Sequence, residues 1–433
     1  MRHLSALVLA GLCACGMPPP VEGPGTPEQP AKTTSYLRDV QPLVERSCKS
    51  CHTAGGVAPL ALDTPEQVTA LGPALWSAID SGRMPPFFAA SSCNSYENDP
   101  RLSDAEKALF KTWLDEGSPL GDAAEARHAP TPQLPVVRHD VELSIGGDFD
   151  VRKMNDTDNY QCFVMNPGNT SDLMVRGYEV IPGNLAVVHH VLAYVVTADQ
   201  VAQLEALDAQ DARLGYGCQT GGVGIQGATR NQVAGWVPGQ YPSRMPADTA
   251  LLLPANSRLV VQIHYNLAAL NDPSVSPLDR TRLALETAPA GMYRRGQILP
   301  MLKPNLSIAA GDANSVQTLE VALPAAFRGA TVYRAMAHAH QLATQVKLEV
   351  VKPDGSSRCV LDNPKWDFNW QRDYTLTTPV QLVTGDKLRI TCVYDNSATN
   401  QPMVGGVQQA PRAVSWGESS FDEMCMTYLT FAQ

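Results

Sequence analysis

The spacing of hydrophobic residues divides this chain into a short helical region and a long strand-rich one. Near the N-terminus, apolar residues recur at helical spacing over residues 37–44. Two capping boxes, Thr64-Pro65-Glu66-Gln67 and Ser103-Asp104-Ala105-Glu106, predict the starts of two more helices, and Gly117 is a stop signal for the second. The pattern predicts three helices before about residue 122.

After about residue 139 the helical spacing ends. Short alternating or apolar runs bounded by turn residues take over, and Asp354-Gly355 marks a hairpin. The clearest runs span residues 185–196, 258–267, 345–351 and 387–394. This pattern is typical of β-sandwiches or jelly rolls, and the region is long enough for two of them.

Composition supports a secreted β protein. The net charge of −10 and the lack of a basic run argue against nucleic acid as a partner. Arg2 and a short apolar core predict a signal peptide, and Leu12-Cys13-Ala14-Cys15 resembles a bacterial lipobox with Cys15 as the lipidated residue. The alternatives are an ordinary cleaved signal or lipidation at Cys13, which fits less well. We expect a lipid anchor on the periplasmic side of a bacterial membrane, the outer one under ordinary sorting.

The remaining cysteines agree with an oxidising compartment. Apart from Cys13, Cys15 and the pair discussed next, six are left, an even number that suits disulfides. These six are Cys93, Cys162, Cys218, Cys359, Cys392 and Cys425.

Cys48-Lys49-Ser50-Cys51-His52 is a C-x-x-C-H motif. Two thiols at this spacing can add to the vinyl groups of a haem, and the adjacent imidazole then reaches the iron. A structural disulfide or half of a zinc site are the alternatives, but the segment supplies only one further Cys for zinc. We therefore expect covalent c-type haem, and the helical segment resembles a small cytochrome c.

Met84 is the candidate for the second axial ligand of the iron. It is the only Met of the segment and lies in the stiff loop Gly82-Arg83-Met84-Pro85-Pro86. A thioether opposite an imidazole raises the reduction potential and favours electron transfer. The alternative is a loop Met that packs on the haem edge.

Five histidines lie in predicted strand cores, where a histidine without a partner is uncommon. His338 and His340 alternate along one strand, so both face the same side. Two imidazoles plus a thioether, such as that of Met424, make a set that favours copper over zinc. His189 and His190 are neighbours and point to opposite faces unless a strand end, bulge or twist intervenes. His264 could complete a three-histidine site with them. The alternative for His338 and His340 is a solvated strand face.

These stretches, in this order, resemble the copper type II, ascorbate-dependent monooxygenases over roughly residues 139–433. The resemblance rests on five motifs: Asp158-Asn159-Tyr160-Gln161-Cys162, His189-His190, Gln262-Ile263-His264-Tyr265, His338-x-His340 and Asp422-Glu423-Met424-Cys425. The family has two jelly-roll domains, each of which holds one copper, across an open cleft.

The resemblance implies roles for individual residues. His189, His190 and His264 would bind a first copper, which stores an electron. His338, His340 and Met424 would bind a second, where oxygen binds and a substrate C–H bond is broken; the alternative for Met424 is a core Met. Tyr428 falls at a substrate-site position of the peptide-amidating members, and the family would pair Cys392 with Cys425.

The sequence departs from the family at two points. The position of an Arg that is thought to hold a substrate carboxylate is occupied by Met336, with Arg334 two residues further back on the same strand face. A glycine-extended peptide is therefore a doubtful substrate. The family's disulfide set is also thinned, so Cys93, Cys162, Cys218 and Cys359 keep three open pairings, of which Cys162 with Cys218 is favoured.

The sequence thus predicts a multidomain protein: a small all-α cytochrome c-like domain followed by two all-β jelly-roll sandwich domains. The expected boundaries are a signal at 1–15, a Pro/Gly-rich tether at 16–32, the haem domain at 33–122, a linker at 123–138, and sandwiches at 139–285 and 286–433.

We expect a copper monooxygenase with two copper ions and haem c that hydroxylates a small molecule or peptide with O₂. Electrons would come from a periplasmic donor through the tethered haem, which acts at high effective concentration. The alternative function is a non-enzymatic redox or copper-binding lipoprotein. A carbohydrate-binding sandwich attached to a cytochrome would leave the five strand histidines unexplained.

Overall fold

The computed structural model describes residues 33–54, 58, 60–129, 135–154, 158–218, 222–228, 231–238, 240–246, 248–324, 327–404 and 406–433. The predicted signal peptide, the lipobox with Cys15 and the tether lie outside these residues. Among the described residues, no helix is both long enough and apolar enough to cross a membrane.

Three helices form near the N-terminus, as the hydrophobic spacing predicts. They are α1 (Gln41–Ser47), which continues a π-helical turn at Tyr36–Val40, α2 (Pro65–Asp80) and α3 (Asp104–Asp115). Both predicted capping boxes are present, with Thr64 accepting from the Gln67 backbone and Ser103 from the Glu106 backbone. A small apolar core around Val40, Phe110 and Trp113 holds the helices together.

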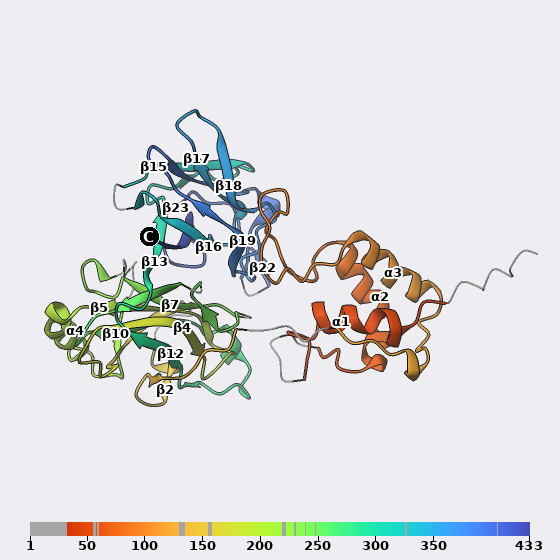
Figure 1. The fold of residues 1–433 in the computed structure, drawn as a ribbon, viewed down its shortest axis with the longest axis horizontal. Helices are drawn as coiled ribbons and strands as arrows, with labels where there is room; N and C mark the ends of the chain where they lie inside the picture. Colours follow the sequence, from red (N-terminus) through yellow and green to blue (C-terminus); the bar gives the residue numbers. More distant parts are fainter. Residues whose placement is uncertain are drawn as a thin grey trace, which may run out of the picture.

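Residues 141–289 form the first β unit, coloured yellow to green in Figure 1. One short helix, α4 (Val201–Asp208), packs against it. Its strands are β1 (Val141–Ser144), β2 (Phe149–Asp150), β3 (Asp158–Met165), β4 (Leu173–Ile181), β5 (Val188–Val196), β6 (Tyr216–Gly217), β7 (Gln232–Trp236), β8 (Ser243–Arg244), β9 (Thr249–Leu253), β10 (Arg258–Asn266), β11 (Leu278–Asp279) and β12 (Arg282–Pro289). Buried aliphatic and aromatic side chains fill its core.

Residues 294–432 form the second β unit, coloured green-blue to blue in Figure 1. Its strands are β13 (Arg294–Leu302), β14 (Ser307–Ile308), β15 (Ser315–Ala322), β16 (Thr331–His338), β17 (Ala343–Val351), β18 (Ser357–Asn363), β19 (Asp373–Gln381), β20 (Lys387–Tyr394), β21 (Met403–Val404), β22 (Val407–Gln408), β23 (Val414–Ser415) and β24 (Met426–Ala432). Strands β15, β20, β17 and β18 form a separate antiparallel sheet over its core.

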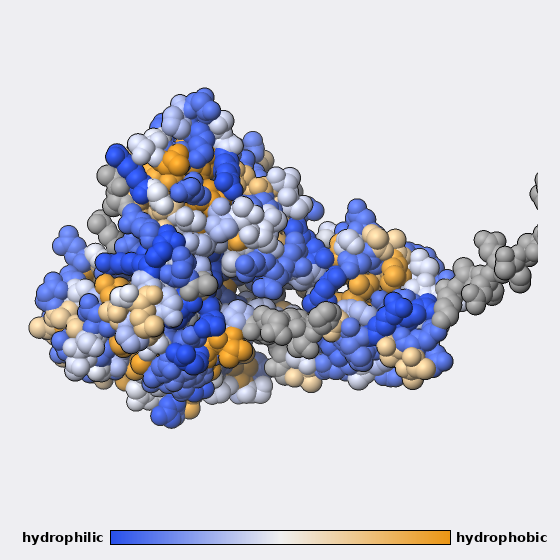
Figure 2. Space-filling view, in the orientation of Figure 1, coloured by the Kyte–Doolittle hydropathy of each residue, from blue (hydrophilic) through white to orange (hydrophobic). Residues whose placement is uncertain are grey.

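Strand β13 joins the two units. It pairs with β24 of the second unit and with β7 and β9 of the first, so strands of both units belong to one 14-stranded sheet. Figure 2 shows that the visible face is mostly hydrophilic, with apolar side chains in small patches, which is ordinary for a folded surface. This shared sheet fixes the two units against each other.

The predicted fold class is wrong. The protein is mostly β-sheet with 17% helix, and no separate small all-α cytochrome c-like domain is evident among the residues described. The physical reason is the segment between α2 and α3, which forms no helix and packs into the second β unit. Phe87, Ala89 and Tyr96 are buried in that unit's core, and Tyr96 forms a β-bridge with Leu376.

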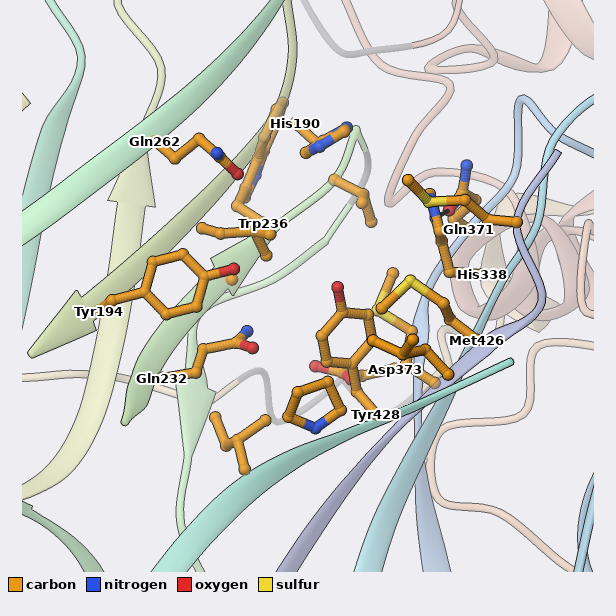
Figure 3. Close-up of a pocket in the computed structure, with 18 of the residues that line it drawn as sticks. His190, Tyr194, Gln232, Trp236, Gln262, His338, Gln371, Asp373, Met426 and Tyr428 are labelled. Carbon is orange, nitrogen blue, oxygen red and sulfur yellow. Dashed lines mark hydrogen bonds between the residues drawn. The ribbon is translucent and has the colours of Figure 1, made fainter. Parts of the chain in front are cut away.

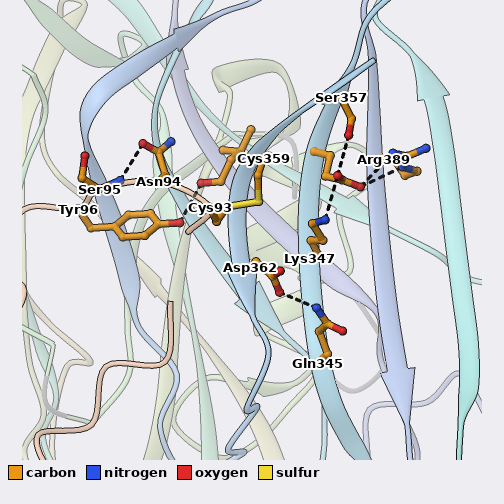
Figure 4. The surroundings of a disulfide bond; sticks show 12 residues. Cys93, Asn94, Ser95, Tyr96, Gln345, Lys347, Ser357, Cys359, Asp362 and Arg389 are labelled. Atoms are coloured by element: carbon orange, nitrogen blue, oxygen red, sulfur yellow. Dashed lines mark hydrogen bonds and ion pairs between the residues drawn. A yellow bond between two sulfur atoms is a disulfide. The ribbon is translucent and has the colours of Figure 1, made fainter. Parts of the chain in front are cut away.

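A disulfide fixes this segment to the second β unit. Cys93 pairs with Cys359 of β18, close to the hydrogen bond from the Tyr96 hydroxyl to the Val360 carbonyl (Figure 4). This pairing was left open by the sequence. The other two disulfides join Cys162 to Cys218, the favoured pairing, and Cys392 to Cys425, the pairing that the family resemblance implies.

Candidate metal centres and cavity

Three histidines of the first β unit form one cluster. His189 and His190 lie at the start of β5, and His264 lies on the neighbouring strand β10. The register pairs His264 with His190 and Tyr265 with Val188, so His189 is an extra residue in the ladder. This irregularity turns two sequence neighbours towards one point, which a regular strand forbids.

The cluster has the geometry of a nitrogen-ligand metal site. One ring nitrogen from each histidine lies within 4.8 Å of the others, and no other group of three His, Cys, Asp or Glu does so among the residues described. Nδ1 of His264 lies 3.1 Å from Nδ1 of His189 and 3.3 Å from Nδ1 of His190. Burial lowers the pKa of His190 well below its usual range, which keeps the imidazole neutral and able to bind a metal.

Tyr160 of β3 supports this cluster. Its ring stacks on His264 with the centroids 4.3 Å apart and the planes 8° from parallel. Its hydroxyl donates to the Glu418 carbonyl at 3.2 Å, so the second β unit holds the tyrosine in place. The stack fixes the orientation of a candidate ligand.

His338 and His340 lie at the end of β16 and just beyond it, with ring centroids 5.3 Å apart. Nδ1–H of His338 donates to Gln371 Oε1 at 2.6 Å, and Gln371 Nε2 donates to the Phe368 carbonyl, which fixes the amide orientation. Nδ1–H of His340 donates to the Asp422 carbonyl at 3.1 Å. Both contacts leave Nε2 to bind a metal, because a ligating histidine is commonly oriented by a hydrogen bond from its other ring nitrogen.

A buried carboxylate joins this pair to Met424. Glu423 accepts backbone hydrogen bonds from His340 at 2.9 Å, Leu342 at 2.7 Å and Met424 at 3.3 Å. Burial raises the pKa of Glu423 to about 8. The sequence gives no sign of this role, because His340 and Leu342 lie about 80 residues away from Glu423.

Two further contacts hold the segment that bears Met424. The Tyr394 hydroxyl donates to the Met424 carbonyl at 2.7 Å. The next residue, Cys425, is in the disulfide with Cys392. Met424 is buried, so its backbone position is determined by the core beneath it.

A cavity of about 150 Å³ lies between the two β units. His190 lines it from one side, and His338 and Met424 line it from the other. Figure 3 shows Tyr194, Gln232 and Trp236 facing Met426 and Tyr428 across this space. Met424, Met426 and Tyr428 share a face, as their alternation predicts.

Two acidic residues, Asp373 and Glu418, line the cavity, whereas no Lys or Arg is among its described lining residues. Asp373 is paired with Arg334, whose Nη1 lies 3.8 Å from Asp373 Oδ2. Arg334 also donates to Ser243 Oγ, to the Arg244 carbonyl at 3.0 Å and to Thr375 Oγ1 at 3.2 Å. Met336, and not Arg334, lines the cavity.

The two histidine groups lie side by side. The ring centroids of His190 and His338 are 6.3 Å apart. The ring centroid of Phe368 lies 5.5 Å from that of His189 and 5.9 Å from that of His340. The open cleft that the family resemblance implies is therefore closed in this structure. A side chain from the loop before β19, which sequence reasoning missed, bridges it.

The C-x-x-C-H segment retains two free thiols. Among the described cysteines only Cys48 and Cys51 are not in disulfides. Burial raises the pKa of Cys48 to about 12. Nδ1–H of His52 donates to the Leu60 carbonyl at 3.1 Å, which leaves Nε2 to bind a metal. Met84 follows α2, and its backbone N–H donates to Ala78 at 2.9 Å.

Comparison with known protein families gives a match within the second β unit. Residues 313–433 match the model of the copper type II ascorbate-dependent monooxygenase C-terminal domain. A tyramine beta-hydroxylase of Caenorhabditis briggsae is 24% identical over 264 residues, which cover 58% of this chain and 41% of that protein. The chain thus spans less than half the length of this curated relative.

Solved structures add no assignment. The infectious bursal disease virus VP2 subviral particle is 11% identical, covers 70% of this chain and 74% of its own, and has a TM-score of 0.20. The major capsid protein P2 of bacteriophage PM2 is 9% identical, covers 69% and 94%, and has a TM-score of 0.22. Scores this low support no assignment of fold or function. Residues 313–433 are thus similar to the C-terminal domain of the copper type II ascorbate-dependent monooxygenases, and a longer stretch of the chain is similar to a tyramine beta-hydroxylase.

Proposed function

We propose that this protein is a copper-dependent monooxygenase that hydroxylates a C–H bond of a small molecule with O₂. One observation carries the proposal: His190 of the three-imidazole cluster lines the same cavity as His338 and Met424, and the ring centroids of His190 and His338 are 6.3 Å apart. A turnover of this kind consumes two electrons, and two copper ions, when bound, would supply one each.

The donor sets fit copper. His189, His190 and His264 offer imidazole nitrogens, which suit copper among other metals, and Met424 adds a soft thioether that favours Cu(I) at the His338 and His340 site. The chain's own contacts fix these ligands: Gln371 and the Asp422 carbonyl each hold a histidine by Nδ1, and Glu423 holds the backbone. Tyr428 lies on the cavity wall, where it would contact substrate.

The cavity favours a neutral or cationic substrate over a carboxylate. Its acidic lining is Glu418 and Asp373, of which Asp373 is paired with Arg334 at 3.8 Å, and the tyrosine and tryptophan walls suit an aromatic ring. The matched relative is named for tyramine, an amine, and we propose an arylalkylamine as the substrate class. A glycine-extended peptide is disfavoured because the Arg334 guanidinium is already held by Asp373, Ser243 and the Arg244 carbonyl.

We further propose covalent haem at Cys48 and Cys51, with His52 and Met84 as axial ligands. Two free thiols in a chain whose other described cysteines are paired fit this chemistry, as does the Nδ1–H contact of His52. The haem would relay electrons from a periplasmic donor to the coppers. Lipidation at Cys15 and a periplasmic location remain predictions on residues that the structure does not describe.

The test combines composition with turnover. Protein matured in a periplasm should contain two coppers and one covalent haem, and His338→Ala and His264→Ala should each remove one copper. With reductant, the wild type should hydroxylate tyramine and leave the matched acid, 3-(4-hydroxyphenyl)propionate, unchanged. No copper, or zinc alone under copper-replete conditions, would contradict the assignment. Copper without any hydroxylation would favour the non-enzymatic redox lipoprotein.

A further inference from the structure

The loop that follows Met84 leads directly to the second histidine pair. Figure 1 shows this orange segment leaving α2 and reaching β19 and β18. It is held rigidly there by the Cys93–Cys359 disulfide, by buried Phe87 and Tyr96, and by the backbone hydrogen bond from Ala90 to Asp362 at 2.8 Å. Its position against the copper unit is therefore fixed by the fold and not by diffusion.

Within this contact, one hydrogen bond connects the two sites. The indole Nε1–H of Trp370 donates to the Pro86 carbonyl at 2.8 Å. Pro86 lies two residues after Met84. The next residue after Trp370 is Gln371, whose Oε1 accepts the Nδ1–H of His338 at 2.6 Å. Figure 3 shows Gln371 beside His338 at the cavity edge.

We propose that Trp370 is the electron relay between the haem segment and the His338 site, through the chain Pro86, Trp370, Gln371 and His338. The inference rests on the proposed haem and copper function and adds its route. In each passage one electron leaves a ferrous haem iron, which becomes ferric, and reduces Cu(II) to Cu(I); no bond is made or broken. Covalent bonds and short hydrogen bonds form the whole chain, with no gap across solvent.

The route also explains how electrons would reach both copper sites. An electron that reaches His338 is 6.3 Å, ring to ring, from His190 of the three-histidine cluster. A further contact of the haem segment is the hydrogen bond between the Ser50 and Tyr241 side chains. Among the described residues, Tyr241 makes no hydrogen bond to any of the five histidines, so it docks the segment without completing a route.

The experiment follows intramolecular electron transfer in the full chain loaded with copper and haem. Under anaerobic conditions a photoexcited ruthenium reductant reduces the haem, and its absorbance reports reoxidation by Cu(II). Trp370→Phe keeps a ring but loses the donor. We expect its reoxidation to be slower than that of the wild type, because the hydrogen-bonded step between the Pro86 carbonyl and the indole becomes a through-space gap. The copper EPR spectrum and haem potential should be unchanged.

Two matched variants separate the relay from packing and docking. Trp366→Phe also removes an indole donor, which bonds the His340 carbonyl at 3.0 Å and not a carbonyl of the haem segment. Tyr241→Phe removes one of the docking contacts. Both should transfer at the wild-type rate. If Trp370→Phe does not accumulate, Gln371→Met interrupts the same chain one step later and should give the same slowing.

The outcomes distinguish the route from the function on which it rests. Wild-type reoxidation that needs copper and is independent of protein concentration, slowed only by Trp370→Phe, supports the relay. Equal rates in the wild type and Trp370→Phe overturn the relay and leave haem-fed copper standing. Equal slowing by the Tyr241 or Trp366 variant overturns it in favour of docking or packing. No copper-dependent reoxidation in the wild type overturns both.

Discussion

Removing the Cys93–Cys359 disulfide should destabilise the protein more than removing either other disulfide. The bond closes a loop of 266 residues, against 56 for Cys162–Cys218 and 33 for Cys392–Cys425. The chain-entropy relation gives about 5.5, 4 and 3.5 kcal/mol for loops of these lengths. The Cys162–Cys218 bond lies inside the longest loop and shortens it, but the dependence on length is logarithmic, so the order is unchanged.

The assay is guanidinium unfolding of three paired Cys→Ser variants, followed by tryptophan fluorescence, since Trp370 donates to the Pro86 carbonyl of the attached segment. We expect the largest loss of unfolding free energy for Cys93→Ser/Cys359→Ser. Its haem reoxidation should also become slower, because docking then depends on Phe87, Tyr96 and a few hydrogen bonds. A loss smaller than that of Cys392→Ser/Cys425→Ser would refute the loop-entropy reasoning and show that buried aromatic contacts suffice.

Three further predictions concern single side chains. Met424→Leu conserves volume and should cost less than about 1.5 kcal/mol of stability, but it should abolish oxygen chemistry and weaken Cu(I) binding, measured by hydroxylation and copper content. The Glu179 carboxylate raises the pKa of His139. This pair should therefore stabilise the fold at acidic pH and lose that effect as pH rises through the raised pKa. An NMR titration of His139 measures the pKa, and the unfolding free energy of the His139→Gln variant measures the effect on stability. Thr64→Ala removes the cap of α2 and should cost about 1 kcal/mol in thermal unfolding.

Each has a result that would contradict it. Met424→Leu with full hydroxylation would show that Met424 is only a core residue. A His139 pKa at or below that of free histidine would remove the ion pair from consideration. Thr64→Ala with unchanged unfolding, beside a destabilised Ser103→Ala control, would mean that α2 is held by packing alone.

Local sequence predicted the local structure well. Capping boxes set the starts of α2 and α3, and strand-like runs mark β5, β10, β17 and β20. The unusual burial of five histidines in strands marked both candidate metal sites before any geometry was known. These signals succeed because capping and side-chain alternation involve residues only a few positions apart.

The prediction of the fold class was wrong because it depends on which distant segments pack into one core. Residues 86–97 look like a loop of a helical domain, but Phe87 and Tyr96 gain more burial inside the second β unit. Helical spacing in the flanking segments carries no information about that choice. The same holds for the pairing of Cys93, which depends on where the loop is packed.

The sequence by itself determined the chemistry that this protein can offer: paired histidines, a methionine beside a cysteine, two thiols at haem spacing, and strands to carry them. Only the tertiary structure decided which of them meet. The meeting of His189 and His190 with His264, the backbone bonds from His340 and Leu342 to Glu423, and the chain from Pro86 through Trp370 to His338 all join positions that lie far apart in sequence. Such contacts follow from the packing of whole sheets, which no local pattern encodes.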